Sequence, residues 1–184
     1  RHLDSAGYDL LGVITGSEGL LGVVTEVILR ILPQPETAKA LLVGFSSIEN
    51  AGNCVAGIIG SGIIPSGMEL MDRYAIHAAD AFTHAGYPLD AEAILIIELD
   101  GSEAEANYFS SRVAQIANDQ GATSVRASSS EKERLQFWAG RKAAFPAVGR
   151  ISPDYYCMDG TIPRSVLAHV LKQISHMSKK YELR

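Results

Sequence analysis

Hydrophobic and polar positions follow a strand-like pattern near the start of the chain. Residues 8–32 combine apolar runs with four glycines. From Val23 to Ile31 successive side chains alternate in type, which is the two-residue period of a β-strand. The pattern predicts a strand here, ended by Pro33 and Pro35.

The two prolines also indicate a linker between domains. Each proline fixes its own φ and disfavours helix at the residue before it, so residues 33–37 form a short, stiff segment. We therefore expect a domain boundary near residue 36, with residues 1–35 in one domain and residues 36–184 in another.

Beyond this boundary, predicted strands alternate with amphipathic helices. The apolar runs predict strands at residues 40–45, 68–71, 93–99 and 123–127. Three capping-box signatures, each a serine followed three residues later by a glutamate, predict helices that begin after Ser46, Ser102 and Ser130. Asp72 is expected to cap a further helix that runs to about Ala85.

The order of these elements predicts the fold class. If the helix after Asp72 is an excursion, the remaining order is strand, helix, strand, strand, helix, strand, the split pattern of a ferredoxin-like fold. The expected fold is therefore α+β, a ferredoxin-like antiparallel sheet with helices on one face. An extended segment over residues 155–162 and a final helix after Pro163 follow it.

Composition restricts the classes of protein. The 184 residues are 47% hydrophobic, and no apolar stretch reaches the ~18 residues of a membrane span. A net charge of -5 without a long basic cluster argues against a nucleic-acid partner. Cys54 and Cys157 are far apart, so they indicate neither a disulfide framework nor a zinc ribbon. We expect a protein without transmembrane segments in a reducing compartment, the cytoplasm.

The histidines do not predict a metal site. His77 and His84 lie seven residues apart, as do His169 and His176, so each pair would be about 10 Å apart along one helix face. Two imidazoles at that separation cannot share one metal without a distant third ligand.

The strongest local signal is the glycine-rich string GSEGLLG at residues 16–22. Closely spaced glycines let backbone N–H groups approach an anion or a flat ring, and Ser17 adds a hydroxyl donor. The string lacks the G-x-G-x-x-G spacing and leads into a predicted strand, so it is not a Rossmann fingerprint. A glycine-rich turn between two strands explains it equally well.

Arg141 is the candidate for binding a carboxylate. Its guanidinium is a planar fork that matches a carboxylate with two hydrogen bonds. On the predicted helix it shares one face with Arg134 and Trp138. The alternative is an ordinary surface face, with Trp138 in the core and the arginines solvated.

Several strings, taken in order, resemble one family. They are AGYDL at 6–10 followed by GSEG at 16–19, GMELMDR at 67–73, WAGRKAAFPA at 138–147 and DGTIPR at 159–164. Together they resemble the FAD-linked oxidases, the family of vanillyl-alcohol oxidase and of the D-lactate and glycolate dehydrogenases. The 2-hydroxyacid branch, with the flavin-bearing D subunits of glycolate oxidases, is the most similar.

The resemblance implies a cofactor, a reaction and site residues. The cofactor would be FAD, and the reaction the oxidation of a 2-hydroxyacid, glycolate or D-lactate, to the 2-oxoacid. Arg141 would bind the substrate carboxylate. Leu20 stands where the family commonly has threonine, so a hydroxyl contact is not implied there. The FAD contacts would come from Gly16, Ser17, Glu18, Gly19, Gly22 and Val23.

The resemblance also implies that the chain is a piece of a longer enzyme. Residues 1–35 would be the last strands of an FAD-binding domain and residues 36–184 a truncated cap domain that binds substrate. The catalytic base and any metal site would lie beyond Arg184, so neither is assigned here. The isolated piece would be inactive, would bind FAD weakly and would expose an apolar patch over residues 10–32.

Two interpretations of the partners remain. The family resemblance implies a small 2-hydroxyacid substrate and further oxidase subunits, flavin and iron–sulfur subunits among them, and it allows peripheral membrane association of the complex. The alternative is a non-catalytic ferredoxin-like module that binds a ligand or another subunit, because this fold does not specify function. Pairing of Arg141 with a neighbouring carboxylate would favour the alternative.

Overall fold

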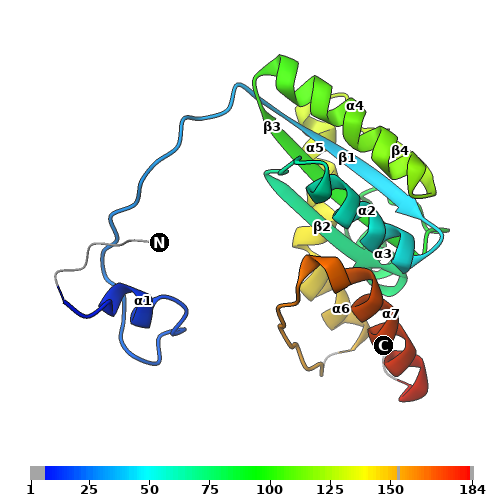
Figure 1. The fold of residues 1–184 in the computed structure, drawn as a ribbon. Coiled ribbons are helices and arrows are strands. Elements are labelled where there is room, and N and C mark those ends of the chain that lie inside the picture. Colours follow the sequence, from blue (N-terminus) through cyan, green and yellow to red (C-terminus); the bar gives the residue numbers. More distant parts are fainter. Residues whose placement is uncertain (1–6, 153, 183–184) are drawn as a thin grey trace. The chain divides into compact units, whose positions relative to one another are not determined.

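The computed structural model describes residues 7–152 and 154–182. The chain divides into two compact units, Arg1–Gln34 and Pro35–Arg184, and the division falls between the two linker prolines. Figure 1 labels the elements of both units.

Four antiparallel strands form one sheet in the second unit (Figure 1). They are β1 (Thr37–Phe45), β2 (Gly67–Asp72), β3 (Ala93–Gly101) and β4 (Ala122–Ala127). Their order in the sheet is β2-β3-β1-β4, so β1 and β3 occupy the centre. Two split strand–helix–strand units produce this order, and the predicted ferredoxin-like sheet is confirmed.

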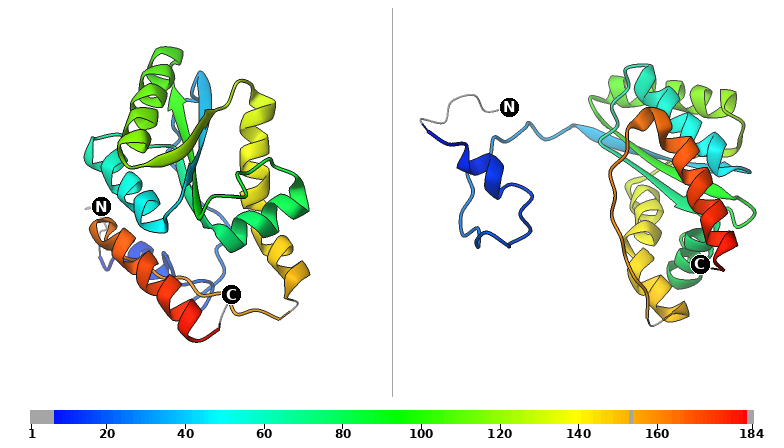
Figure 2. Two further views of the ribbon diagram at one scale, coloured as in Figure 1. Left: turned by 90° about the vertical axis from the view of Figure 1, so that its right-hand side faces the viewer. Right: turned by 60° about the horizontal axis from the view of Figure 1, so that its bottom comes forward.

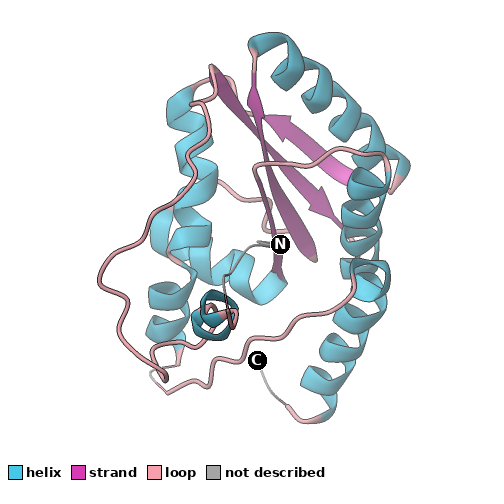
Figure 3. Cartoon of the chain, turned by 60° about the vertical axis from the view of Figure 1, so that its left-hand side comes forward, coloured by secondary structure: helices cyan, strands magenta, loops and turns pink. Residues whose placement is uncertain are grey.

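Helices cover both faces of this sheet, as Figures 2 and 3 show. On one face, α2 (Ile48–Gly60) and α4 (Glu103–Asp119) pack against Leu41 and Val43 of β1. On the other, α3 (Arg73–Thr83) and α5 (Glu131–Lys142) pack against Leu42 of β1 and Ile96 of β3. The prediction of helices on one face therefore describes α2 and α4 only.

The central strands explain why both faces are covered. Every side chain from Ala40 to Phe45, glycine apart, and from Ala93 to Ile97 is apolar and buried. Such continuous apolar runs, in contrast to alternating ones, need a hydrophobic layer on each side. The excursion between β2 and β3, which includes α3, supplies part of the second layer.

Serine side chains cap α2 and α4 by accepting hydrogen bonds from backbone N–H groups of the first helical turn. Ser47, not the predicted Ser46, caps α2, and its Oγ accepts from the backbone N–H of Glu49 at 3.1 Å. The prediction was wrong by one residue because Ser47 is the last residue in extended conformation. The capping box of Ser102 and Glu105 at the start of α4 is confirmed.

Two further caps fix the helices on the other face. Asp72 caps α3, as predicted, by accepting from the N–H of Ala75 at 2.9 Å. Ser130 caps α5 through the N–H of Glu133 at 3.3 Å. In a capping box the glutamate would accept from the backbone N–H of the capping serine, Ser130. Here the Glu133 carboxylate accepts from the backbone N–H of Ser129 instead, at 2.8 Å.

The rest of the second unit is helical and irregular. α6 (Ala144–Ile151) follows α5, and a 3₁₀ turn, η1 (Arg164–Val166), leads into α7 (Leu167–Lys180). α7 packs on α2 at Gly52, where an added Cβ would lie 2.8 Å from the Cα of Ala168. The predicted extended segment at 155–162 forms no strand.

The first unit contains a short helix and an extended coil. α1 (Leu10–Ile14) is capped by Asp9, whose Oδ1 accepts from the N–H of Gly12 at 2.9 Å. Residues 22–35 form no strand, so the strand predicted from Val23 to Ile31 is wrong for this structure. A strand needs a hydrogen-bonded neighbour, and no described strand pairs with this segment.

The apolar side chains of the first unit are exposed, as expected for residues 10–32. Val23, Ile28 and Ile31 are each more than four-fifths exposed. An apolar surface of this extent is typical of a region that another protein surface covers. Within the described residues, no helix combines the length and apolar character needed to cross a membrane.

Candidate functional site

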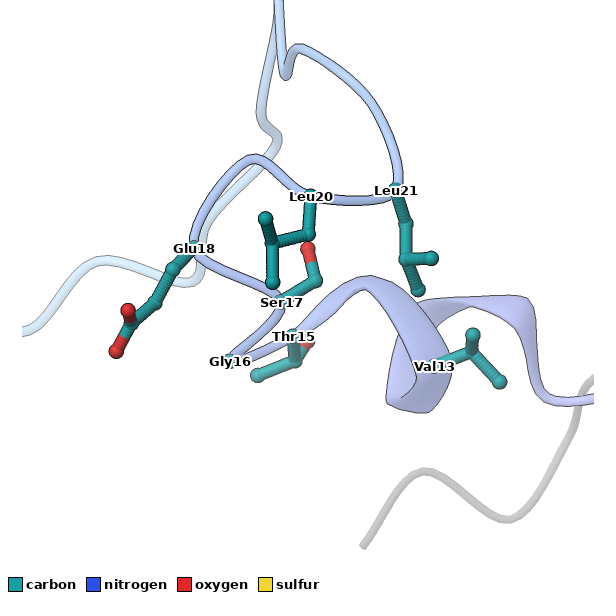
Figure 4. A pocket seen from close by; sticks show the side chains of 7 residues that line it. All are labelled: Val13, Thr15, Gly16, Ser17, Glu18, Leu20 and Leu21. Carbon is teal, nitrogen blue, oxygen red and sulfur yellow. The ribbon is translucent and has the colours of Figure 1, made fainter.

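The glycine-rich turn of the first unit forms an open pocket. The pocket has a volume of about 460 Å³ and follows directly on α1 (Figure 4). Its lining combines apolar side chains with the polar turn: Val13, Thr15, Gly16, Ser17, Glu18, Leu20 and Leu21. In Figure 4, the Glu18 carboxylate extends away from Leu20 and Leu21.

Backbone conformation explains the glycines in this turn. Gly16 and Gly19 both have φ 82°, a left-handed conformation that side chains rarely adopt, and Glu18 between them has φ 51°. The turn is closed by the Leu20 N–H, which donates to the Ser17 carbonyl at 2.9 Å. A Cβ built on either glycine meets no atom within 4 Å, so the backbone is open to a ligand.

The structure brings together only part of the predicted cofactor set. Gly16, Ser17 and Glu18 line the pocket. Gly19 belongs to the same turn but does not line the pocket. Gly22 and Val23 lie in the coil that follows, where both are exposed.

The second candidate region is the face of α5 that lies over the sheet. Arg134, Trp138 and Arg141 share this face, as predicted. Their partners are two carboxylates that extend from the strands beneath, Glu98 of β3 and Glu69 of β2. Both arginines are therefore paired with acidic residues of the sheet. The alternative in which they are solvated on an ordinary surface face does not describe this structure.

Each of the three guanidinium nitrogens of Arg134 donates a hydrogen bond. Its Nη1 donates to Glu98, and its Nε and Nη2 each donate to Glu131 at 2.7 Å. The hydrogen bonds to Glu131 raise the pKa of Arg134 above its ordinary value. Trp138 adds a hydrogen bond from Nε1 to Glu98 at 2.7 Å. The Arg134 side chain, 17% exposed, is a structural anchor of α5.

Arg141 differs from Arg134 in how much of its guanidinium is engaged. Its Nε donates to Glu69 Oε2 at 3.1 Å. Its side chain is 33% exposed and that of Glu69 is 41% exposed, so the pair lies at the protein surface. Among the described residues, Glu69 is the only side chain shown to accept a hydrogen bond from this guanidinium. The Nη1 and Nη2 groups, which form the end of the fork, stay available for a ligand.

A buried tyrosine supports the turn of α5 that carries Arg141. Tyr87 is 4% exposed, and its hydroxyl donates to the carbonyl of Phe137 at 2.5 Å. The ring lies so close to α5 that a Cβ on Gly140 would be 2.6 Å from its carbons. Glu69 thus holds the side chain of Arg141, and Tyr87 supports the neighbouring backbone of α5.

The ionisation of Tyr87 predicts how stability depends on alkaline pH. Burial raises the pKa of Tyr87 to about 12, against the lowering effect of the Arg141 backbone N–H. The unfolded chain loses this proton near pH 10, so the contribution to stability is complete below pH 10 and is lost as the pH rises toward 12.

We expect Tyr87→Phe to lower the free energy of unfolding by about 1–2 kcal/mol at pH 8, through the lost buried hydrogen bond. The difference from the native protein should shrink between pH 10 and 12. Urea unfolding at several pH values measures both effects. Tyr108→Phe, at an exposed ring, is the control. An unchanged difference at every pH would contradict the assignment.

Other polar and aromatic side chains of these elements have structural contacts. Asp72 caps α3, whereas Glu69, the other acid of the GMELMDR string, binds Arg141. Tyr155 stacks on Phe145 with ring centroids 6.5 Å apart. Arg150 lies over the ring of Phe82.

Sequence reasoning missed Glu98 and Tyr87. Glu98 interrupts the apolar run of β3, and a charged residue in a buried strand signals a partner. That signal was readable, although the identity of the partner was not. Tyr87 follows a turn glycine and gave no signal of its contact with α5.

Comparison with protein families identifies a match over residues 34–184, to the model described as FAD linked oxidases, C-terminal domain. Among solved structures, alkyldihydroxyacetonephosphate synthase in crystal form P1 is similar with a TM-score of 0.70. At 18% identity, over 96% of this chain and 38% of that one, this similarity concerns the fold alone.

Curated relatives are similar over nearly the whole chain. Glycolate oxidase subunit GlcD of Escherichia coli K12 is 58% identical over 99% of this chain and 36% of its own length. The protein of the same name in Bacillus subtilis is 35% identical over 98% of this chain and 38% of its own length. The mitochondrial D-lactate dehydrogenase [cytochrome] of Arabidopsis thaliana is 30% identical over 97% and 31%.

The chain thus spans about a third of the length of these relatives, from 31% to 38%. The family match, in contrast, covers most of the chain, from residue 34 to residue 184. The chain belongs to the FAD-linked oxidase family, through the C-terminal domain that characterises it.

Proposed function

We propose that this chain is part of an FAD-dependent enzyme that oxidises a small 2-hydroxyacid, glycolate or D-lactate, to the 2-oxoacid. The family match and the names of the relatives support this reaction class. The observation that carries it is the Arg141 guanidinium, partly exposed and hydrogen-bonded only through Nε, which can receive a carboxylate.

The role of Arg141 is to bind and orient the substrate. Two parallel hydrogen bonds from its Nη groups to the substrate carboxylate fix the direction in which the α-carbon points. When bound, FAD would supply the redox chemistry, acceptance of a hydride from that carbon while the hydroxyl proton leaves to a base. The protein contributes a fixed carboxylate anchor, which α5 and the sheet hold in place.

The glycine-rich turn is proposed to contact FAD through Gly16, Ser17, Glu18, Gly19, Gly22 and Val23. The exposed glycine backbone and the apolar lining of the pocket fit a flat ring. The Glu18 carboxylate would repel a pyrophosphate at this turn, so the fit favours the flavin ring. This turn belongs to the first unit, and we propose that residues 1–35 come from an FAD-binding domain and residues 36–184 form the substrate-binding cap.

Gly19→Val tests the role of the turn in the full-length protein. A β-branched residue at φ 82° strains the turn and places two methyl groups over the open backbone, so we expect FAD affinity to fall about tenfold or more. Flavin fluorescence titration measures it. Gly62→Val is a matched control, because Gly62 has the same φ and equally open surroundings at the end of α2. Equal affinity in both variants would refute the contact.

The partners and the compartment are also proposals. The E. coli and B. subtilis relatives are named as subunits of glycolate oxidase. By analogy, we propose a complex with other oxidase subunits, flavin and iron–sulfur subunits included, that associates peripherally with a membrane. A cytoplasmic site for this complex agrees with Cys54 and Cys157, both free thiols.

The proposed reaction is tested on the full-length protein loaded with FAD. Reduction of an artificial electron-accepting dye is followed with glycolate, D-lactate and L-lactate. We expect turnover with glycolate or D-lactate and little with L-lactate. Absence of turnover with every 2-hydroxyacid, in a protein that retains FAD, would overturn the proposal.

The second candidate function is a non-catalytic ferredoxin-like binding module. The pairing of Arg141 with Glu69 favours it, since a paired arginine can be purely structural. The same dye assay separates the two functions, because only the enzyme transfers electrons from a 2-hydroxyacid.

A further inference from the structure

Glu69 places a negative charge directly beside the proposed substrate anchor. It is a residue of β2, and its side chain lies on the sheet face that α5 covers. Glu69 Oε2 accepts from Arg141 Nε at 3.1 Å. The Glu69 side chain is 41% exposed, so its charge beside Arg141 is accessible from solvent.

Arg141 and Glu69 together form a neutral pair. A lone arginine would attract a substrate more strongly with each additional negative charge. With Glu69 attached, one substrate carboxylate gains hydrogen bonds from the Nη groups, whereas a second carboxylate on the same substrate meets the Glu69 charge. Like charges this close disfavour binding in a partly desolvated site.

We propose that Glu69 is a positioning residue that both orients the Arg141 guanidinium and makes the site selective for monocarboxylic over dicarboxylic 2-hydroxyacids. This inference rests on the proposed function. By holding Nε, Glu69 turns the Nη groups outward. Once one substrate carboxylate has bound Arg141, the negative charge of Glu69 disfavours a second carboxylate on the same substrate. It acts on the substrate through Arg141 and through charge, and takes no part in proton or hydride transfer.

The neighbouring pair supplies a matched control within the same fold. Glu98 of β3 holds Arg134 about two turns earlier on α5, roughly 10 Å along the helix from Arg141. Both pairs join the same helix to the same sheet face. Loss of Glu98 therefore weakens the docking of α5 without removing charge beside Arg141.

The test compares two acids of equal carbon number, D-2-hydroxybutyrate and D-malate, with the full-length holoenzyme. We expect the native enzyme to prefer the monocarboxylate in kcat/KM. Glu69→Gln should raise KM for D-2-hydroxybutyrate and narrow the preference over D-malate about tenfold. Glu98→Gln should lower thermal stability and leave the preference unchanged. Glu69→Asp, which keeps the charge, should preserve the preference while KM rises for both acids.

Each result decides the question. If Glu69→Gln and Glu98→Gln change the kcat/KM of both acids by the same factor, Glu69 is only structural and the inference fails. If Glu69→Gln does not fold, loss of the preference in Glu69→Asp would equally refute it. If the native holoenzyme oxidises neither acid nor any other 2-hydroxyacid, the proposed function itself fails.

Discussion

Replacing Arg141 with alanine is expected to lower kcat/KM for the 2-hydroxyacid about a thousandfold. The variant loses two charge-assisted hydrogen bonds to the substrate carboxylate, each worth about 1.5–3 kcal/mol. It also leaves the Glu69 carboxylate without its partner, beside the position where the substrate carboxylate would bind. Steady-state kinetics of the full-length protein, with the FAD content measured in parallel, tests this.

Two controls separate binding from folding. Lys142→Ala removes the adjacent, exposed cation of α5 and should leave kcat/KM unchanged. Arg141→Lys keeps the charge but not the planar fork, so it should recover only a small part of the activity. Activity of Arg141→Ala within threefold of the native enzyme would remove Arg141 from the site.

Gly140→Ala is expected to destabilise the protein by about 3 kcal/mol, a large effect for one methyl group. The new Cβ would lie 2.6 Å from ring carbons of Tyr87, far inside van der Waals contact. Tyr87 is buried and cannot move aside, so α5 must shift away from the sheet. The same shift displaces Arg141, and we expect KM to rise with the loss of stability.

Gly60→Ala is the matched control for this substitution. Gly60 also lies in a helix, at the end of α2, but its Cβ would meet no atom within 4 Å. Alanine there should be neutral or stabilise by up to about 1 kcal/mol, because it is the better helix former. Thermal unfolding of both variants makes the comparison. Equal melting temperatures would show that α5 is not packed against Tyr87 as described.

Local chemistry explains which parts of the fold were predictable from sequence. The caps at Asp72 and Ser102 act within three residues, so sequence spacing contains the whole interaction. The four strands were readable from their apolar runs. The same runs, at residues 40–45 and 93–97, also implied the second layer of helices, because a strand that is apolar at every position has no face for water.

Non-local contacts account for what was missed. The strand predicted from Val23 to Ile31 has the right alternation, but alternation does not supply a neighbour for its backbone hydrogen bonds. At the site, Arg141 and Glu69 are 72 residues apart in sequence. Charge type made Arg141 a candidate, whereas its partner depended on the register of β2 beside β3, which a single sequence does not reveal.

The excursion between β2 and β3 makes the fold modular. The sheet and its α2–α4 layer are complete without it, since they follow from the two split strand–helix–strand units. The excursion contributes α3 and Tyr87, and through Tyr87 it supports the helix that carries Arg141. Part of the support of the proposed substrate anchor therefore lies in a stretch of chain that the sheet does not need, so changes in the excursion can shift α5 while the sheet stays constant.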